Sequence, residues 1–112
     1  MAGVEEAGLD YDSTLTFADH VGFRCGVCFE YPVYDILQRK PLALCERPLI
    51  VMEGSMLGGQ YMGFSHEKSL PLIQKLAETC KMFNGDFTLL WHNSSLISRK
   101  DRELYGKVLV GV

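Results

Sequence analysis

Apolar residues recur at intervals of three and four in the middle of the chain, which is the period of one face of an α-helix. The recurring positions are Leu72, Ile73, Leu76, Ala77, Cys80 and Phe83. Pro71 lies early in this segment, where a missing amide hydrogen does little harm, and Asn84-Gly85 is a typical helix stop. The pattern predicts a helix over residues 65–83.

Two predicted strands flank this helix, at Pro48 to Met52 and at Phe87 to Trp91. The first is a continuous apolar run, which is typical of a strand that is buried on both faces. Residues 100–108 can form a closing helix. The order strand, helix, strand, helix predicts an α/β fold with parallel strands.

The amino-terminal part of the chain has shorter patterns. Residues 4–8 resemble the last turn of a helix closed by Gly8, and Tyr11 to Phe17 predicts a short strand. Residues 33–37 and 42–44, joined by the polar turn Gln38-Arg39-Lys40, predict a small β-hairpin. Residues 19–30 contain glycines and cysteines and predict a loop.

The amino-acid composition limits the classes of partner that the protein can have. The 112 residues are 47% hydrophobic and 22% charged, which suits one globular domain, and the net charge of −3 offers no basic surface for nucleic acid. No apolar run reaches the roughly 18 residues of a membrane helix, and the first residues lack the pattern of a signal peptide. Four cysteines are too few for a disulfide scaffold. We therefore expect a cytoplasmic protein with no nucleic-acid or membrane partner.

His92 is the first candidate for chemistry. It follows the apolar run Leu89-Leu90-Trp91 and precedes the small polar residues Asn93-Ser94-Ser95. In barrels and open α/β sheets, the carboxyl ends of the strands carry the reactive side chains. The alternative is a histidine that caps a strand and hydrogen-bonds a nearby carbonyl.

Four motifs in order resemble a known family. They are Tyr11-Asp12-Ser13-Thr14-Leu15, Gly22-Phe23-Arg24-Cys25-Gly26, Glu46-Arg47-Pro48-Leu49-Ile50-Val51-Met52 and Leu89-Leu90-Trp91-His92-Asn93-Ser94. In this order the chain resembles bacterial polysaccharide deacetylase-like proteins of the NodB-homology class. The resemblance covers nearly all of residues 1–112, but it corresponds to only the carboxy-terminal part of that family's domain.

The resemblance implies a partial (β/α) barrel with parallel strands and a small β-hairpin insertion. It also implies metal-dependent hydrolysis of N- or O-acetyl groups on carbohydrates, in which zinc or another divalent metal activates water. A late histidine of the family protonates the leaving group, and His92 matches it. His92 is thus the expected general acid.

The family's other catalytic elements have no match. The chain has no Asp-Asp pair after a strand, and His20, His66 and His92 are too widely spaced for His-x-x-x-His. The arginine that steadies the family's base belongs to an upstream segment, so Arg24 is not assigned to it. We expect no metal ligands or cofactor here, and no activity from the chain alone. The alternative is a non-catalytic half-barrel that binds a partner chain or carbohydrate.

Several further residues are candidates for substrate binding. Asp12, Ser13 and Thr14 could line a sugar cleft, or Asp12 could form an Asx-type turn. Arg24 could reach a carboxylate or phosphate, or form an internal salt bridge. Trp91 could stack on a sugar ring, although a tryptophan at a strand end is more often part of the core. Asn93 lies beside the expected acid.

Two glutamates and a cysteine pair complete the set of candidates. Glu46 precedes a buried strand and suits a structural role, whereas Glu53 ends that strand and is a weak candidate for the cleft. Cys25 and Cys28 have the spacing of a redox or zinc half-site, with His20 near, but no second pair follows.

A truncated sheet should also leave an open edge and uncovered apolar faces. We expect these faces at Leu49 to Met52 and at Phe87 to Leu90. The chain should therefore self-associate or dock on a missing half of the barrel.

Overall fold

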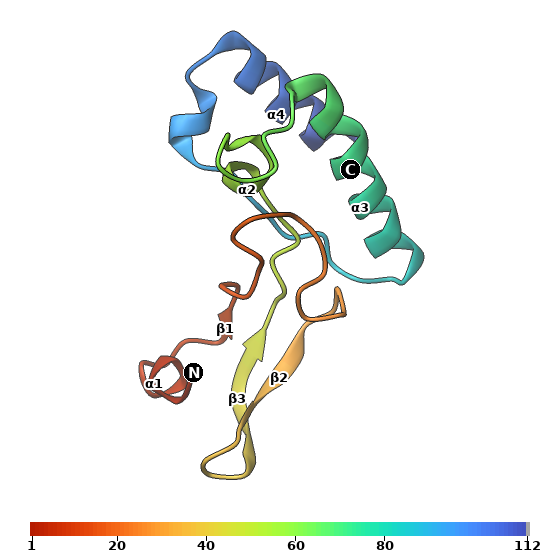
Figure 1. Cartoon of the computed structure of the whole chain (residues 1–112). Coiled ribbons are helices and arrows are strands. Elements are labelled where there is room, and N and C mark those ends of the chain that lie inside the picture. The colour runs from red at the N-terminus through yellow and green to blue at the C-terminus, as the bar shows by residue number, and fades with distance from the viewer. Residues whose placement is uncertain (112) are drawn as a thin grey trace.

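The mixed α/β structure has two parts that differ in secondary structure, a β arm and a helical body (Figure 1). The computed structural model describes residues 1–111 and measures 47 × 29 × 22 Å. The β arm contains α1 (Ala2–Glu6), β1 (Tyr11–Asp12), β2 (Tyr31–Asp35) and β3 (Lys40–Glu46). The helical body contains β4 (Val51–Met52), α2 (Glu53–Leu57), α3 (His66–Met82), β5 (Leu89–Leu90), the 3-10 helix η1 (Asn93–Leu96) and α4 (Arg99–Gly111).

The β arm is a three-stranded sheet in the order β1-β3-β2. β2 and β3 pair antiparallel, with Asp35 opposite Lys40 at the turn, which confirms the predicted hairpin. The first strand begins and ends two residues earlier than predicted, and the second is longer than predicted. β1 pairs parallel to β3, with Asp12 opposite Glu46. The strand predicted over residues 11–17 ends at Asp12, because the carboxylate of Asp12 binds the backbone of Thr14 and turns the chain.

The amino-terminal segment also follows its pattern. α1 ends at Glu6, and Gly8 then has φ +81, which is the left-handed conformation expected of a glycine after a helix. The side chain of Glu5 accepts a hydrogen bond from the backbone of Ala43 at 2.6 Å. This contact fixes α1 against β3.

α3 and α4 confirm the two predicted helices. The side chain of Ser65 caps α3 by accepting a hydrogen bond from the backbone of Lys68. After α3, Asn84 takes the left-handed conformation with φ 54. Gly85 has a different role, because a Cβ atom at this position would lie 2.3 Å from Cys28 Sγ.

β4 and β5 form a separate parallel pair, with Val51 opposite Leu89 and Met52 opposite Leu90. Each strand is shorter than the strand predicted from the sequence, since only the two residues named for each strand form the ladder. Directly after Met52 the chain begins α2, a helix that the sequence patterns did not predict.

The expectation of an uncovered face at Leu49 to Met52 is wrong. Leu49, Ile50 and Val51 are buried, because the loop before β2 and the helices of the body cover them. In that loop Gly22 donates a hydrogen bond to the carbonyl of Ile50. The second run stays partly open, since Leu90 is 40% exposed.

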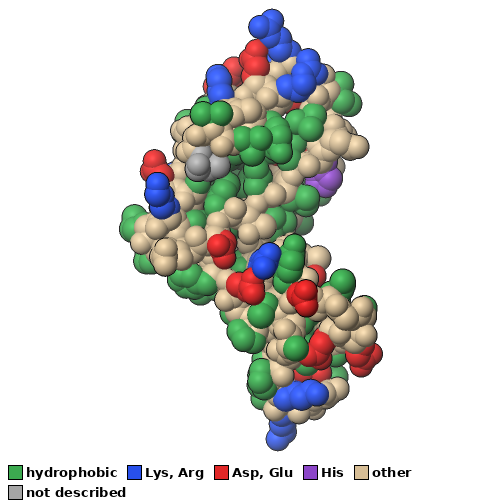
Figure 2. All heavy atoms as spheres, turned by 180° about the vertical axis from the view of Figure 1, so that it is seen from behind, with side chains coloured by type: hydrophobic (Ala, Val, Ile, Leu, Met, Phe, Trp, Pro, Cys, Tyr) green, Lys and Arg blue, Asp and Glu red, His purple; other side chains and the backbone are tan. Residues whose placement is uncertain are grey.

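One apolar core lies within the helical body. Its buried members are Cys28, Ile50, Val51, Met56, Ile73, Cys80, Leu104 and Val108. Leu42 and Leu44 are also buried but lie outside this core, in the arm. Figure 2 shows apolar side chains gathered over the body and acidic ones where the two parts meet. Within residues 1–111, no helix combines the length and apolar character needed to cross a membrane.

Candidate functional site: a histidine and a buried glutamate

His92 and Glu53 meet where the two parallel strands of the body end. Glu53 directly follows β4, and His92 lies two residues beyond β5. Since the strands are parallel and in register, their carboxyl ends lie at the same edge of the sheet. Glu53 Oε1 lies 2.6 Å from His92 Nδ1 and also accepts a hydrogen bond from the backbone nitrogen of His92 at 3.0 Å.

The two side chains differ in exposure. The side chain of Glu53 is 1% exposed, whereas that of His92 is 49% exposed. A carboxylate can only accept hydrogen bonds, so Nδ1 of His92 is the donor and Nε2 is left to gain or lose a proton. The pair can therefore deliver a proton from Nε2 to a molecule at the exposed side of His92.

Sequence reasoning named both residues but did not pair them. The sequence alternative for His92 was a strand-end histidine bound to a carbonyl, but the acceptor is the carboxylate of Glu53. Glu53 was only a weak cleft candidate. The signal that could have found the pair is their shared position, because each follows one of two parallel strands.

Trp91 and Asn93 flank His92 differently. The indole nitrogen of Trp91 donates to the carbonyl of Ser95 at 2.9 Å, and its ring packs on the core and lies 5.2 Å from the ring of Tyr105. This arrangement favours the structural interpretation of Trp91. Asn93 is exposed next to His92, where it can reach a bound molecule.

Asp12, Ser13 and Thr14 lie in the arm rather than beside His92 (Figure 1). Asp12 Oδ2 accepts hydrogen bonds from the backbone nitrogen of Thr14 at 3.1 Å and from its hydroxyl at 2.6 Å. This is the Asx-type turn that the sequence analysis gave as the alternative. The structure does not bring these three residues into one site with His92.

Glu46 lies opposite Asp12 in the arm and forms a second buried acidic site. Burial, and then the hydrogen bond with Asp12, raise the pKa of Glu46 to about 7. Burial alone would raise the pKa of Asp12, but hydrogen bonds from Thr14 and Glu46 outweigh it and lower that pKa. The two carboxyl groups therefore share one proton near neutral pH. The structural role predicted for Glu46 agrees with its hydrogen bond from the backbone of Leu15.

Arg24 makes no ion pair with any of residues 1–111, so the internal salt bridge considered for it is wrong. Its guanidinium instead donates to the carbonyl of Thr16 at 2.9 Å. The hydroxyl of Ser55 binds the same loop through the carbonyl of Ala18 at 2.8 Å. Arg24 thus fixes the loop after β1 internally, and Ser55 holds that loop against α2.

The cysteines and His20 do not form a shared site. Cys28 is buried beside Cys80, whereas Cys25 lies near Tyr31 and raises the pKa of that phenol to about 12. His20 bonds its neighbour Asp19 at 2.7 Å and stacks on a phenylalanine. Across residues 1–111, no three histidine, cysteine, aspartate or glutamate side chains are placed to hold one metal ion. The residues described here do not fit the metal that the family resemblance implies, and no chemical step is assigned to a metal here.

Comparison with known proteins gives no assignment. No family model, no curated protein and no solved structure matches this chain.

Proposed function

We propose that this chain is the carboxy-terminal portion of a metal-dependent carbohydrate deacetylase, in which His92 is the general acid. The observation that carries the proposal is the 2.6 Å contact between His92 Nδ1 and the buried carboxylate of Glu53. A histidine held in this way keeps Nε2 directed outward, as a general acid requires. The position of the pair at the carboxyl ends of parallel strands is typical of catalytic groups in barrels.

The parallel pairs β1–β3 and β4–β5 are, in this proposal, part of a partial (β/α) barrel, and the hairpin β2–β3 is an insertion. The protein is a cytoplasmic hydrolase whose substrate is an acetylated sugar. The remainder of the domain supplies the metal site and the base. The chain alone is expected to be inactive, because the described residues offer no metal site that would polarise the acetyl carbonyl and activate water.

The chemical step assigned to His92 is protonation of the leaving group. As the bond between the acetyl carbon and the sugar nitrogen or oxygen breaks, its electron pair moves to the leaving atom. The proton on Nε2 is transferred to that atom, and Nε2 keeps the lone pair. Glu53 holds the ring in place through Nδ1 during this transfer.

The test combines this chain with a polypeptide that carries the Asp-Asp and His-x-x-x-His elements. In the active complex, His92→Ala should lower kcat by about 10² to 10⁴ with little change in KM. His92→Gln should be equally impaired, since an amide cannot transfer a proton at neutral pH. The loss should be smaller with an aryl acetate, whose leaving group needs no protonation.

His66→Ala is the matched control. His66 also pairs with a carboxylate, Asp101, at 2.5 Å, but it lies where α3 meets α4. This variant should retain activity on an acetamido sugar. Near-normal turnover by His92→Ala would contradict the proposed acid.

A second candidate function is a non-catalytic half-barrel that binds a partner chain or carbohydrate. The observation in its favour is the open edge of β5, which pairs with only β4 among the described strands and leaves Leu90 40% exposed. Light scattering should then show self-association. If the chain were a stable monomer that melts cooperatively, this candidate would lose its support.

A further inference from the structure

Ser95 is the third donor to the same oxygen of Glu53. Its hydroxyl lies 3.0 Å from Glu53 Oε1, which also accepts from Nδ1 and from the backbone nitrogen of His92. The other oxygen, Oε2, is buried and has no partner among residues 1–111. All of the hydrogen bonds that orient the carboxylate therefore converge on one atom.

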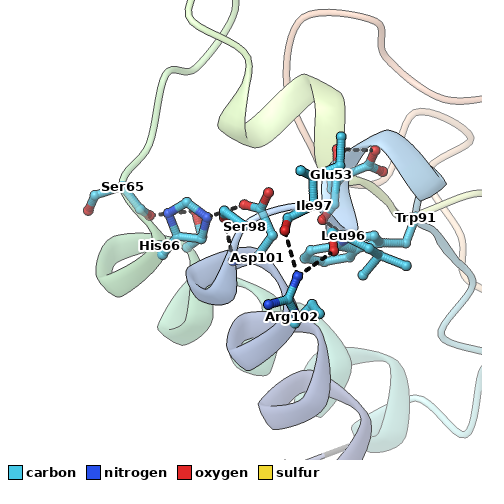
Figure 3. A network of polar contacts seen from close by, with 11 residues as sticks. Glu53, Ser65, His66, Trp91, Leu96, Ile97, Ser98, Asp101 and Arg102 are labelled. Atoms are coloured by element: carbon cyan, nitrogen blue, oxygen red, sulfur yellow. Dashed lines mark hydrogen bonds and ion pairs between the residues drawn. The ribbon is translucent and has the colours of Figure 1, made fainter.

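The backbone holds Ser95 firmly in this position. Trp91 Nε1 donates to the carbonyl of Ser95 at 2.9 Å, and the amide of Ser95 donates to the carbonyl of His92 at 3.0 Å. Further along, the guanidinium of Arg102 donates to the carbonyls of Leu96 and Ile97 (Figure 3). The segment after His92 is thus fixed at both ends before it contacts any substrate.

We propose that Ser95 is a positioning residue, whose hydroxyl holds Oε1 of Glu53 so that the carboxylate keeps Nδ1 of His92 inward and Nε2 outward. The terminal torsion of a glutamate side chain is broad, so a carboxylate with fewer donors can rotate. A partial rotation would move Oε1 out of line with Nδ1 and weaken the hydrogen bond that holds the imidazole. The consequence for rate rests on the proposed function, whereas the positioning itself does not.

The experiment compares Ser95→Ala with Ser94→Ala in the free chain. Ser94 is the matched control, because it is adjacent and exposed and its side chain makes no hydrogen bond within residues 1–111. Long-range ¹⁵N–¹H NMR should show the Nδ1-protonated form of His92 in the native protein. In Ser95→Ala, exchange of the Nδ1 proton with solvent should become about fivefold faster, as expected for the loss of one hydrogen bond.

Two further variants separate positioning from a loss of folding. Ser95→Thr keeps a hydroxyl, so exchange of the His92 Nδ1 proton should stay slow. Ser95→Cys keeps the approximate size of the side chain but has only a weak donor, so this proton should exchange fast. Circular dichroism should show equal helix content in all four variants. Unchanged exchange in Ser95→Ala, or an equal acceleration in Ser94→Ala, would overturn the assignment.

Kinetic measurements on the active complex distinguish the positioning role of Ser95 from the role of His92 as general acid. In the active complex, Ser95→Ala should lower kcat about fivefold and leave KM unchanged. If His92→Ala keeps its activity while Ser95→Ala accelerates proton exchange, the acid role fails and the positioning stands. If the Nδ1 proton exchanges at the native rate in Ser95→Ala while His92→Ala is inactive, the positioning role of Ser95 fails and the acid role of His92 stands.

Discussion

The β arm and the helical body each bury one glutamate, and the neighbours of these glutamates differ. Glu46 in the arm and Glu53 in the body are 0% and 1% exposed. Each also accepts a backbone hydrogen bond at Oε1, from Leu15 and from His92 respectively. The arm places an acid, Asp12, against its glutamate, whereas the body places an imidazole.

The difference shows that burial alone does not decide what a glutamate does. Burial and the neighbouring acid Asp12 favour a proton on Glu46, whereas the neighbour of Glu53 is the imidazole of His92, which can donate from Nδ1. The arm consequently has a proton-sharing pair with a structural role. The body has a pair that can take part in acid catalysis.

The largest expected effect concerns Glu46 and pH. Its pKa is about 7 in the folded protein and 4.5 in the unfolded chain, so the folded state binds more protons between these values. The contribution of Glu46 to the free energy of unfolding should therefore be highest below about pH 4.5. It should fall by about 3 kcal/mol as the pH rises to 8. Urea unfolding at several pH values measures this slope.

Glu46→Gln should remove that slope. An amide stays neutral and can donate to Asp12, so the variant should exceed the native protein in stability at pH 8 and match it at pH 4. Hydrogen bonding to Cys25 raises the pKa of Tyr31 to about 12, so Tyr31, opposite Glu46, stays neutral throughout. A native protein with flat stability over this range would contradict the shared proton.

The same substitution at Glu53 should have the opposite sign. Glu53→Gln removes the negative charge that His92 contacts and places an amide donor where Oε2 has no partner. Stability should fall by about 1–3 kcal/mol at pH 7, measured by urea unfolding. A stabilised Glu53→Gln variant would show that the two glutamates are equivalent after all.

The smallest expected effect concerns the two residues with left-handed backbone. Arg39 in the hairpin turn and Asn84 after α3 have φ values of 52 and 54. Arginine tolerates this conformation less well than asparagine. Arg39→Gly should raise the melting temperature slightly, corresponding to about 0.5 kcal/mol, whereas Asn84→Gly should leave it nearly unchanged. Equal shifts in the two variants would remove this contrast between arm and body.

The elements that the sequence predicted best are those whose pattern is local. The helix periodicity from Leu72 to Phe83 and the polar turn at Arg39 each specify their structure within a few residues, and α3 and the hairpin β2–β3 follow them. The apolar pattern of Pro48 to Met52 correctly predicted a buried strand, whereas the expectation that a truncated sheet leaves Leu49 to Met52 uncovered was wrong. The strand itself is short, because the paired length depends on how the body packs. α2 was missed, since Glu53 was expected at a strand end and not at a helix start.

The candidate site was only partly predictable, because it depends on contacts between residues that are far apart in the sequence. His92 and Glu53 could be named from their positions after apolar runs, but their contact depends on the register of β4 against β5. That register brings together residues 39 positions apart. Ser95 had no pattern of its own, because its hydroxyl acquires a role only through the carboxylate that it contacts.

The close approach at Gly85 has a consequence for how far this sequence can vary. Any side chain there would collide with Cys28, whose carbonyl accepts the hydrogen bond of Asp86 just before β5. Gly106 on α4, in contrast, has open space around it. In a library with every amino acid at both positions, selection for folding should leave position 85 almost invariant and position 106 diverse. A site that touches no substrate would thus be among the least replaceable in the chain.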